Sequence, residues 1–249
     1  MKIVFAGPSL AGAWNCVRHH YPSIAFRPPA RRGDILRAVV DGATAIGLID
    51  GHFGEAASVW HKEILYALSC NVAICGGASM GALRAAECQV FGMVGVGRIF
   101  AAYASGRLLD DEAVALIHGP EELEWMPLSI PRVDYEATME KLTALGLISA
   151  AERDKFLLNA GFLHYSQRTY RSMVESCSFL SPERQQRLLE EIALHKQDVK
   201  REDAQAVLAW IADHRSVSRD PDWTFSHTTH WQQLRREIVP ADGNAHDRE

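Results

Sequence analysis

The sequence predicts an α/β fold, in which a mostly parallel sheet core with flanking helices is followed by a helical C-terminal half. Before residue 131, short apolar runs alternate with amphipathic stretches, which is typical of consecutive βαβ units. Several of these runs end in glycine-containing turns, as strands commonly do. Beyond Pro131 the strand signal almost disappears, and stretches with helical periodicity follow one another.

Four short apolar runs in the first half are predicted to form strands: residues 2–6, 23–26, 45–49 and 72–75. Helices are predicted between and after these strands. Asp34 is the predicted N-cap of one helix, residues 59–68 carry an apolar face at helical spacing, and residues 82–88 are rich in helix formers. If the strands are parallel, the turns that follow them meet at one edge of the sheet, where open α/β proteins place their sites.

The second half is predicted to be helical over residues 135–147, 152–164, 182–195 and 202–214. Ser181 followed by Pro182 is a typical helix start, with the serine as N-cap and the proline at the first helical position. We therefore divide the chain into an α/β core at residues 1–130, a helical subdomain at 131–215 and a polar C-terminal tail at 216–249.

Composition and charge exclude several classes of function. The 249 residues carry 26 Lys and Arg against 31 Asp and Glu, a net charge of −5, so no nucleic acid partner is expected. The five cysteines are odd in number and form no Cys-x-x-Cys pair, which argues against a zinc site and a disulfide framework. We expect no metal and no other cofactor.

The sequence also carries no sign of a membrane partner or of export. No apolar run approaches the roughly 18 residues of a membrane span. The N-terminal stretch has the pattern of a first strand rather than that of a signal peptide. We therefore expect a cytoplasmic protein.

The strongest local motif is the stretch from Gly77 to Gly81, which fits the pattern Gly-x-Ser-x-Gly between an apolar run and a helix. This context is what a nucleophile elbow requires, and it makes Ser79 the candidate nucleophile. Backbone N–H groups near Met80, at the start of the helix, could stabilise an oxyanion. Two other interpretations stay open: a glycine-rich turn capped by Ser79, or a turn that binds a phosphate.

A serine nucleophile needs a base, and two neighbouring residues are candidates. His61 could act with Asp50 or Glu63 as its orienting partner, whereas Lys62 could act alone. Lysine is scarce in this arginine-rich first half, and arginine cannot serve as a base. A lysine base requires its pKa to fall from ~10.4 to ~7, or roughly 4.6 kcal/mol of differential interaction. The alternative for Lys62 is a solvated helix residue in an exposed ion pair.

Two further polar features accompany this motif. Ser9 and Asp50 follow two other predicted strands, so the same sheet edge would make them supporting residues of the site. Asp110, Asp111 and Glu112 form an acidic cluster, which we interpret as a helix start or an exposed turn rather than a metal site.

Five blocks within roughly residues 1–120 resemble the TfuA family. They are VFAGPSL at 4–10, RRGDI at 31–35, LIDGHF at 48–53, VWHKEIL at 59–65 and GASMGALRAAE at 77–87. The resemblance implies a hydrolase-like Ser–Lys site, whose serine falls on Ser79 and whose lysine falls on Lys62. It thereby favours Lys62 over His61. In this site Gly77, Met80 and Gly81 would form the turn and the oxyanion site.

The resemblance also implies partners and a reaction. TfuA-like proteins act with YcaO enzymes in peptide backbone thioamidation, where they release sulfide by hydrolysing a thiocarboxylated ThiS-like carrier protein and help YcaO to engage its precursor peptide. The alternative is a non-catalytic adaptor that tethers YcaO to its peptide and sulfur carrier. A phosphate or nucleotide binder built on the glycine-rich turn is a third class, and the five blocks weigh against it.

Overall fold

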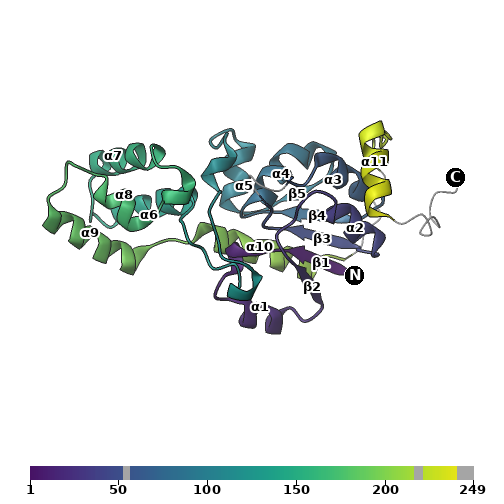
Figure 1. Ribbon diagram of the computed structural model, residues 1–249, viewed down its shortest axis with the longest axis horizontal. Coiled ribbons are helices and arrows are strands. Elements are labelled where there is room, and N and C mark those ends of the chain that lie inside the picture. Colours follow the sequence, from purple (N-terminus) through teal and green to yellow (C-terminus); the bar gives the residue numbers. More distant parts are fainter. Residues whose placement is uncertain (53–56, 216–220, 240–249) are drawn as a thin grey trace.

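The computed structural model describes residues 1–52, 57–215 and 221–239. Its centre is a parallel sheet of five strands in the order β2-β1-β3-β4-β5 (Figure 1). The strands are β1 (Lys2–Phe5), β2 (Ile24–Arg27), β3 (Ala45–Leu48), β4 (Ala73–Gly76) and β5 (Val94–Gly95). Every residue of β3 is buried, because helices cover both faces of a parallel sheet.

Three helices pack on one face of the sheet: α2 (Asp34–Val40), α3 (His61–Ser69) and α4 (Met80–Cys88). Their buried side chains, such as Ile35 and Ile64, form one core with Ile46 and Ile74 of the strands. At the β5 edge, α5 (Gly97–Ala104) packs against α4. This face contains the two elements that carry Lys62 and Ser79.

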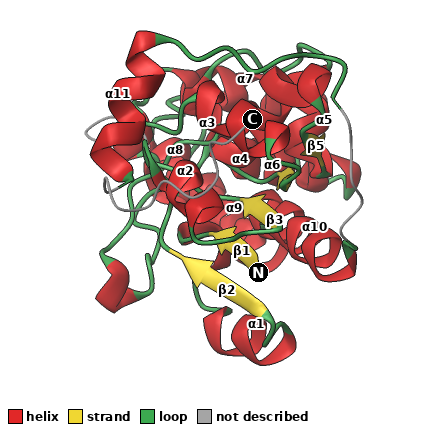
Figure 2. Ribbon diagram, turned by 90° about the vertical axis from the view of Figure 1, so that its right-hand side faces the viewer, coloured by secondary structure: helices red, strands yellow, loops and turns green. Residues whose placement is uncertain are grey.

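The opposite face is covered by α1 (Trp14–His20) and α10 (Val199–Asp213), as Figure 2 shows. Although α10 lies far along the chain, its Val207, Leu208 and Ile211 belong to the same core as Val4 and Cys75 of the sheet. A Cβ on Gly47 of β3 would lie 3.1 Å from both Val207 and Ile211. Glycine in the middle of β3 therefore lets α10 lie close to the strands.

The helices α6 (Arg132–Ala144), α7 (Ala150–Gly161), α8 (Tyr170–Glu175) and α9 (Pro182–His195) form a separate group, on the left in Figure 1. They share a core that includes Tyr135, Met139 and Phe156. From this group the chain returns to the sheet through α10. The last helix, α11 (Thr229–Ile238), packs on α2, where its Trp231 and Leu234 are buried against Leu36.

The predicted fold class is confirmed, with differences at individual elements. The helix predicted at residues 182–195 has those bounds, and the Ser181 hydroxyl accepts from the Arg184 N–H as expected of an N-cap. The N-cap prediction for Asp34 was wrong, because Gly33 precedes the helix with φ +92° and Asp34 is its first residue. The sequence patterns missed β5, α1, α5, α8 and α11.

The division into domains stays a prediction, and two helices bear on it. α10, within the range predicted as a helical subdomain, packs on the sheet, and α11 lies within the range predicted as a polar tail. Residues 216–220 and 240–249 of that tail lie outside the described residues. Throughout the described part of the chain, every helix is too short or too polar to cross a bilayer.

Candidate active site

The strand order places a switch point at one edge of the sheet. In the order 2-1-3-4-5, the connection from β1 leads to β2 on one side of the sheet, whereas β3, β4 and β5 follow one another on the other side. Ligands of such folds bind between β1 and β3, outside the carboxyl ends of these strands. The turn from Gly7 to Ser9 follows β1, and Asp50 comes shortly after β3. The structure brings these two predicted supporting segments together.

Asp50 connects the two turns through its carboxylate. One oxygen, Oδ2, accepts the backbone N–H groups of Gly7 at 2.9 Å and Ser9 at 3.0 Å. The other, Oδ1, accepts the Ser9 hydroxyl at 2.7 Å. Both Ser9 and Asp50 are buried, so these bonds hold the turn after β1 against the end of β3.

Lys200 joins this pair from the second residue of α10. Its ammonium lies 3.9 Å from Asp50 Oδ1 and donates to the Val114 carbonyl at 3.0 Å. Burial lowers the pKa of Lys200, while the negative charges of Asp50, Asp134 and Asp198 act in the opposite direction. No local sequence pattern points to Lys200, because only the return of α10 to the sheet places it beside Asp50.

A cavity of 460 Å³ adjoins the Ser9–Asp50–Lys200 cluster. Ser9 and Lys200 line it together with Asp134, Tyr170 and Arg201. Its walls therefore come both from the sheet edge and from the helical group. Cavities of this size in such a position are typical of ligand-binding sites.

Ser79 lies at the turn between β4 and α4, where it is the residue before the first helical one. Ala78, just before it, adopts a left-handed conformation with φ +65°, which is rare for a residue with a side chain. Ser79 occupies the N-cap position of α4, as the alternative interpretation expected, but its hydroxyl forms no capping bond. In the described part of the chain, this hydroxyl takes part in no hydrogen bond.

The three residues predicted to form the turn and the oxyanion site differ in how their backbone N–H groups are used. Gly77 N–H donates to Leu48 O and Gly81 N–H donates to Ile49 O, each at 3.2 Å. Within the described residues, the Met80 N–H has no such partner. Of the three predicted turn residues, Met80 is thus the one whose amide is available to an oxyanion.

The turns after β3 and β4 are in contact. A Cβ on Gly51 would lie 2.8 Å from Cγ of Met80, and one on Gly81 would strike the Leu48 carbonyl. These two glycines therefore let the Ser79 turn lie against the end of β3, next to Asp50.

The structure places Lys62 in a different environment. Its ammonium lies 4.5 Å from the centre of the Phe225 ring, a cation–π distance. Lys62 shares a helix face with Tyr66, whose ring packs on Phe225 and Trp231. Within residues 1–52, 57–215 and 221–239, no hydrogen bond or ion pair joins Lys62 to Ser79.

His61 also has a partner other than those expected. Its Nε2 lies 2.7 Å from Glu87 Oε2, so neither Asp50 nor Glu63 orients it. Burial would raise the pKa of Glu87, but the hydrogen bonds from His61 and Arg84 lower it overall. Glu63 instead accepts the backbone N–H of Gly33 at 2.9 Å, and burial raises its pKa.

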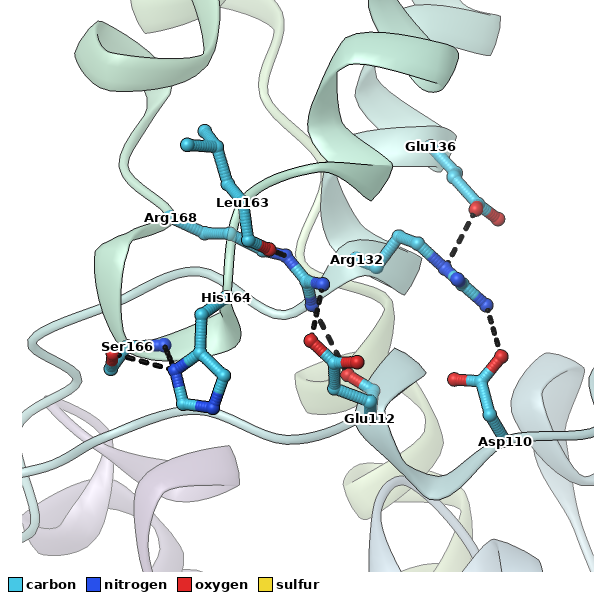
Figure 3. A network of polar contacts seen from close by, with 8 residues as sticks. All are labelled: Asp110, Glu112, Arg132, Glu136, Leu163, His164, Ser166 and Arg168. Carbon is cyan, nitrogen blue, oxygen red and sulfur yellow. Dashed lines mark hydrogen bonds and ion pairs between the residues drawn. The ribbon is translucent and has the colours of Figure 1, made fainter.

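The acidic cluster is used for ion pairs with arginines. Asp110 pairs with Arg132 at 3.0 Å and Glu112 pairs with Arg168 at 2.7 Å (Figure 3). Asp111 begins a short 3-10 helix, Asp111–Ala113, in agreement with the predicted helix start. Among the described residues, no group of three or more His, Cys, Asp or Glu side chains is placed to hold a metal ion.

The fold and the site define a doubly wound α/β protein with a buried serine at a strand-to-helix turn. A family model described as TfuA-like protein matches residues 50–169, a range that contains Lys62, Ser79 and the first two helices of the helical group. This match covers just under half of the 249 residues, and on it the chain is assigned to the TfuA-like protein family. A search of curated proteins gave no match. Phe53, in one of the five sequence blocks, lies outside the described residues.

Proposed function

We propose that the protein hydrolyses the C-terminal thiocarboxylate of a ThiS-like sulfur carrier and thereby supplies sulfide to a YcaO enzyme that thioamidates a peptide backbone. The observation that carries this proposal is the placement of Ser79. Its hydroxyl is neither a helix cap nor part of another described hydrogen bond, and it lies at the start of α4 beside an unused amide. Membership of the TfuA-like family supports the choice of reaction.

In the proposed reaction, a neutral lysine amine takes the proton of the Ser79 hydroxyl. The Ser79 oxygen attacks the thiocarboxylate carbonyl carbon, and the Met80 N–H stabilises the negative oxygen that forms. The carbon–sulfur bond then breaks, and the protonated lysine gives its proton to the departing sulfur, so that hydrosulfide leaves and the carrier is held as an ester on Ser79. Water attacks this ester while the lysine takes one of its protons and passes it to the serine oxygen, which releases the carrier carboxylate.

The family resemblance assigns the role of base to Lys62. In the structure its ammonium lies on the Phe225 ring, so this role requires the side chain to leave that ring and turn toward the sheet edge. Lysine has a flexible four-carbon side chain, and Lys62 is the second residue of α3. Ser9 and Asp50 support the site by fixing the neighbouring turn, and His61 is held by Glu87.

A second proposed function is that of an adaptor between YcaO, its precursor peptide and the sulfur carrier. It is favoured by a group of exposed apolar side chains in and beside the loop between His118 and Pro127. An isolated antiparallel β-bridge joins these two residues. Exposed apolar side chains that gather in this way are typical of protein-binding surfaces. Those of the loop are Ile117, Leu123, Met126 and Leu128, each at least 41% exposed.

The first test is sulfide release from a purified thiocarboxylated ThiS-like carrier. Ser79→Ala is expected to slow release by at least about 10³-fold, because the nucleophile is lost. Lys62→Ala should produce a loss of similar size if Lys62 is the base, whereas the exposed Ser105→Ala serves as a matched control. Wild-type release by both Ser79→Ala and Lys62→Ala would contradict the hydrolase proposal.

The adaptor proposal has its own readout in the thioamidated peptide. With sulfide added to the reaction, Ser79→Ala should support YcaO as well as the wild type does, because the adaptor surface is intact. Replacing the exposed Leu123, Met126 and Leu128 by serine should instead lower thioamidation in the presence of sulfide. If it does not, this loop is not the adaptor surface.

A further inference from the structure

Lys200 is a buried cation that uses only part of its hydrogen-bonding capacity. It is 2% exposed, and an ammonium has three N–H donors. One donates to Val114 O, and Asp50 Oδ1 at 3.9 Å is beyond hydrogen-bond distance. Within the described residues, the remaining donors have no acceptor. Because leaving such donors empty in a buried place is costly, they mark a position where an oxygen can bind.

This position lies in the wall of the 460 Å³ cavity, since Lys200 is one of its lining residues. The Asp50 carboxylate behind Lys200 already accepts three hydrogen bonds from Gly7 and Ser9. It is therefore fixed in place and has little capacity left to accept from Lys200. The ammonium keeps its unused donors for whatever enters the cavity.

The other charges along the cavity are largely compensated. Arg201 forms an ion pair with Asp198 at 3.0 Å and donates to the Ala11 carbonyl at 2.7 Å. Burial raises the pKa of Asp134 to about 7, so only about half of this carboxyl is charged at neutral pH. The exposed Lys196 adds a further positive charge to the lining. The charge that an incoming group meets is thus positive.

The remaining lining favours a narrow chain rather than a compact polar molecule. Apolar side chains of Leu116, Pro127 and Ile130 form much of the surface and offer no side-chain donors. The cavity adjoins the turn after β1 through Pro8 and Ser9, and the Ser9 hydroxyl donates to Asp50 after β3. A chain end that enters here therefore reaches the carboxyl edge of the parallel sheet, the edge at which the turn with Ser79 also lies.

We propose that this cavity binds the anionic C-terminal end of a protein chain, with the Lys200 ammonium donating to the terminal carboxylate or thiocarboxylate. The proposal rests on the function proposed above, since it places the tail of the sulfur carrier in this cavity. Lys200 is then a binding residue for the substrate, distinct from the base that activates Ser79.

The test measures binding without turnover, in the full-length Ser79→Ala protein. The probes are a short fluorescent peptide that ends in Gly-Gly with a free carboxylate, the same peptide with a C-terminal amide, and inorganic phosphate as a competitor. The acid peptide is expected to bind at least about tenfold more tightly than the amide, as for the loss of one charge-assisted hydrogen bond. Phosphate should compete only weakly, because it lacks the chain.

The decisive variant is Lys200→Met combined with Asp50→Asn, which removes both buried charges together so that neither is left unpaired. It should bind acid and amide equally, whereas Lys155→Met, whose ammonium lies on Phe179 in the helical group, should keep the preference. As a measurement that needs no substitution at the site, the side-chain NMR signal of Lys200 should shift on addition of the acid peptide and not of the amide.

Equal binding of acid and amide, an unchanged preference in the double variant, or binding of phosphate alone would each overturn the proposal. Its outcome is separate from that of the hydrolase proposal. A preference for the acid in a protein that releases no sulfide would retain the binding site and reject the reaction. Sulfide release by a protein that binds the acid and the amide peptide equally would support the reaction and reject the binding site.

Discussion

Asp134 shows how much one buried carboxyl can matter to the stability of this protein. Its Oδ1 accepts the backbone N–H groups of Val199 at 2.8 Å and Lys200 at 3.2 Å, at the start of α10. Burial and the nearby charge of Asp198 raise its pKa to about 7 from an ordinary 3.8, against the opposing effect of Lys200. The folded protein therefore holds a proton here that the unfolded chain has released.

This difference predicts a pH dependence of the free energy of unfolding. The stabilising contribution of protonated Asp134 is full below pH 3.8 and is lost as pH rises toward 7, because the folded state binds more protons in this window. Between pH 5 and 7 the wild type should lose about 1 kcal/mol per pH unit relative to Asp134→Asn, whose amide oxygen can still cap α10. Urea unfolding at pH 5, 6 and 7 measures this. Parallel curves for the two proteins would contradict it, and the exposed Asp154→Asn is the control.

At the level of single residues, the sequence predicts those residues of the candidate site that stand in local motifs. Ser79 stands in a glycine-rich turn between a strand and a helix, and Asp50 follows a strand, so both could be placed at the sheet edge. Lys200 could not be found in this way, because nothing in its own segment distinguishes it from a solvated helix residue. Its burial beside Asp50 depends on a contact between two distant parts of the chain.

At the level of elements, Arg168 fastens the helical group to the loop that follows α5. The side chain is buried, and its guanidinium donates to Leu163 O, Glu112 O and Glu112 Oε1 (Figure 3). The backbone carbonyl of Arg168 also accepts from Ile130 N–H at 2.8 Å. One residue thus connects three segments between Glu112 and α8.

Arg168→Met is expected to lower the free energy of unfolding by about 2–3 kcal/mol, because it removes a buried, charge-assisted set of hydrogen bonds. Arg171→Met serves as a matched control, since the ion pair of Arg171 with Glu175 is largely exposed and should contribute less than about 0.5 kcal/mol. Denaturant unfolding followed by circular dichroism measures both. Equal small effects would show that Arg168 does not fasten these segments.

Helices with local signals were predicted well, and those without them were not. α9 has the predicted bounds because Ser181 and Pro182 mark its start in the sequence itself. α5 has no such signal, because the carboxylate that accepts the N–H groups of Arg98 and Ile99 belongs to Asp203 of α10. A two-residue strand such as β5 is too short to show the alternation of apolar and polar residues by which strands are predicted.

For the whole molecule, the position of α10 decides what can fold alone. Residues 1–131 contain all five strands, but one face of the sheet is completed by Val207, Leu208 and Ile211. Without α10 the apolar side chains of Val4 and Cys75 lose this cover.

A fragment of residues 1–131 is therefore expected to show no cooperative unfolding transition, in contrast to the full chain. Joining residues 199–239 to this fragment through a flexible linker should restore cooperativity at least in part, because it returns α10 and α11. Thermal unfolding followed by near-ultraviolet circular dichroism compares the three proteins. A cooperative transition in the 1–131 fragment would show that α10 is dispensable for the sheet.

The order of the strands and α10 along the chain has a consequence for biosynthesis. A ribosome makes the five strands first, and the helix that covers their second face follows only after the whole helical group of α6 to α9. Until then the nascent polypeptide displays an uncovered apolar surface, the kind of surface that chaperones recognise and that drives aggregation. Native packing of the sheet is thus completed only once α10 has been made.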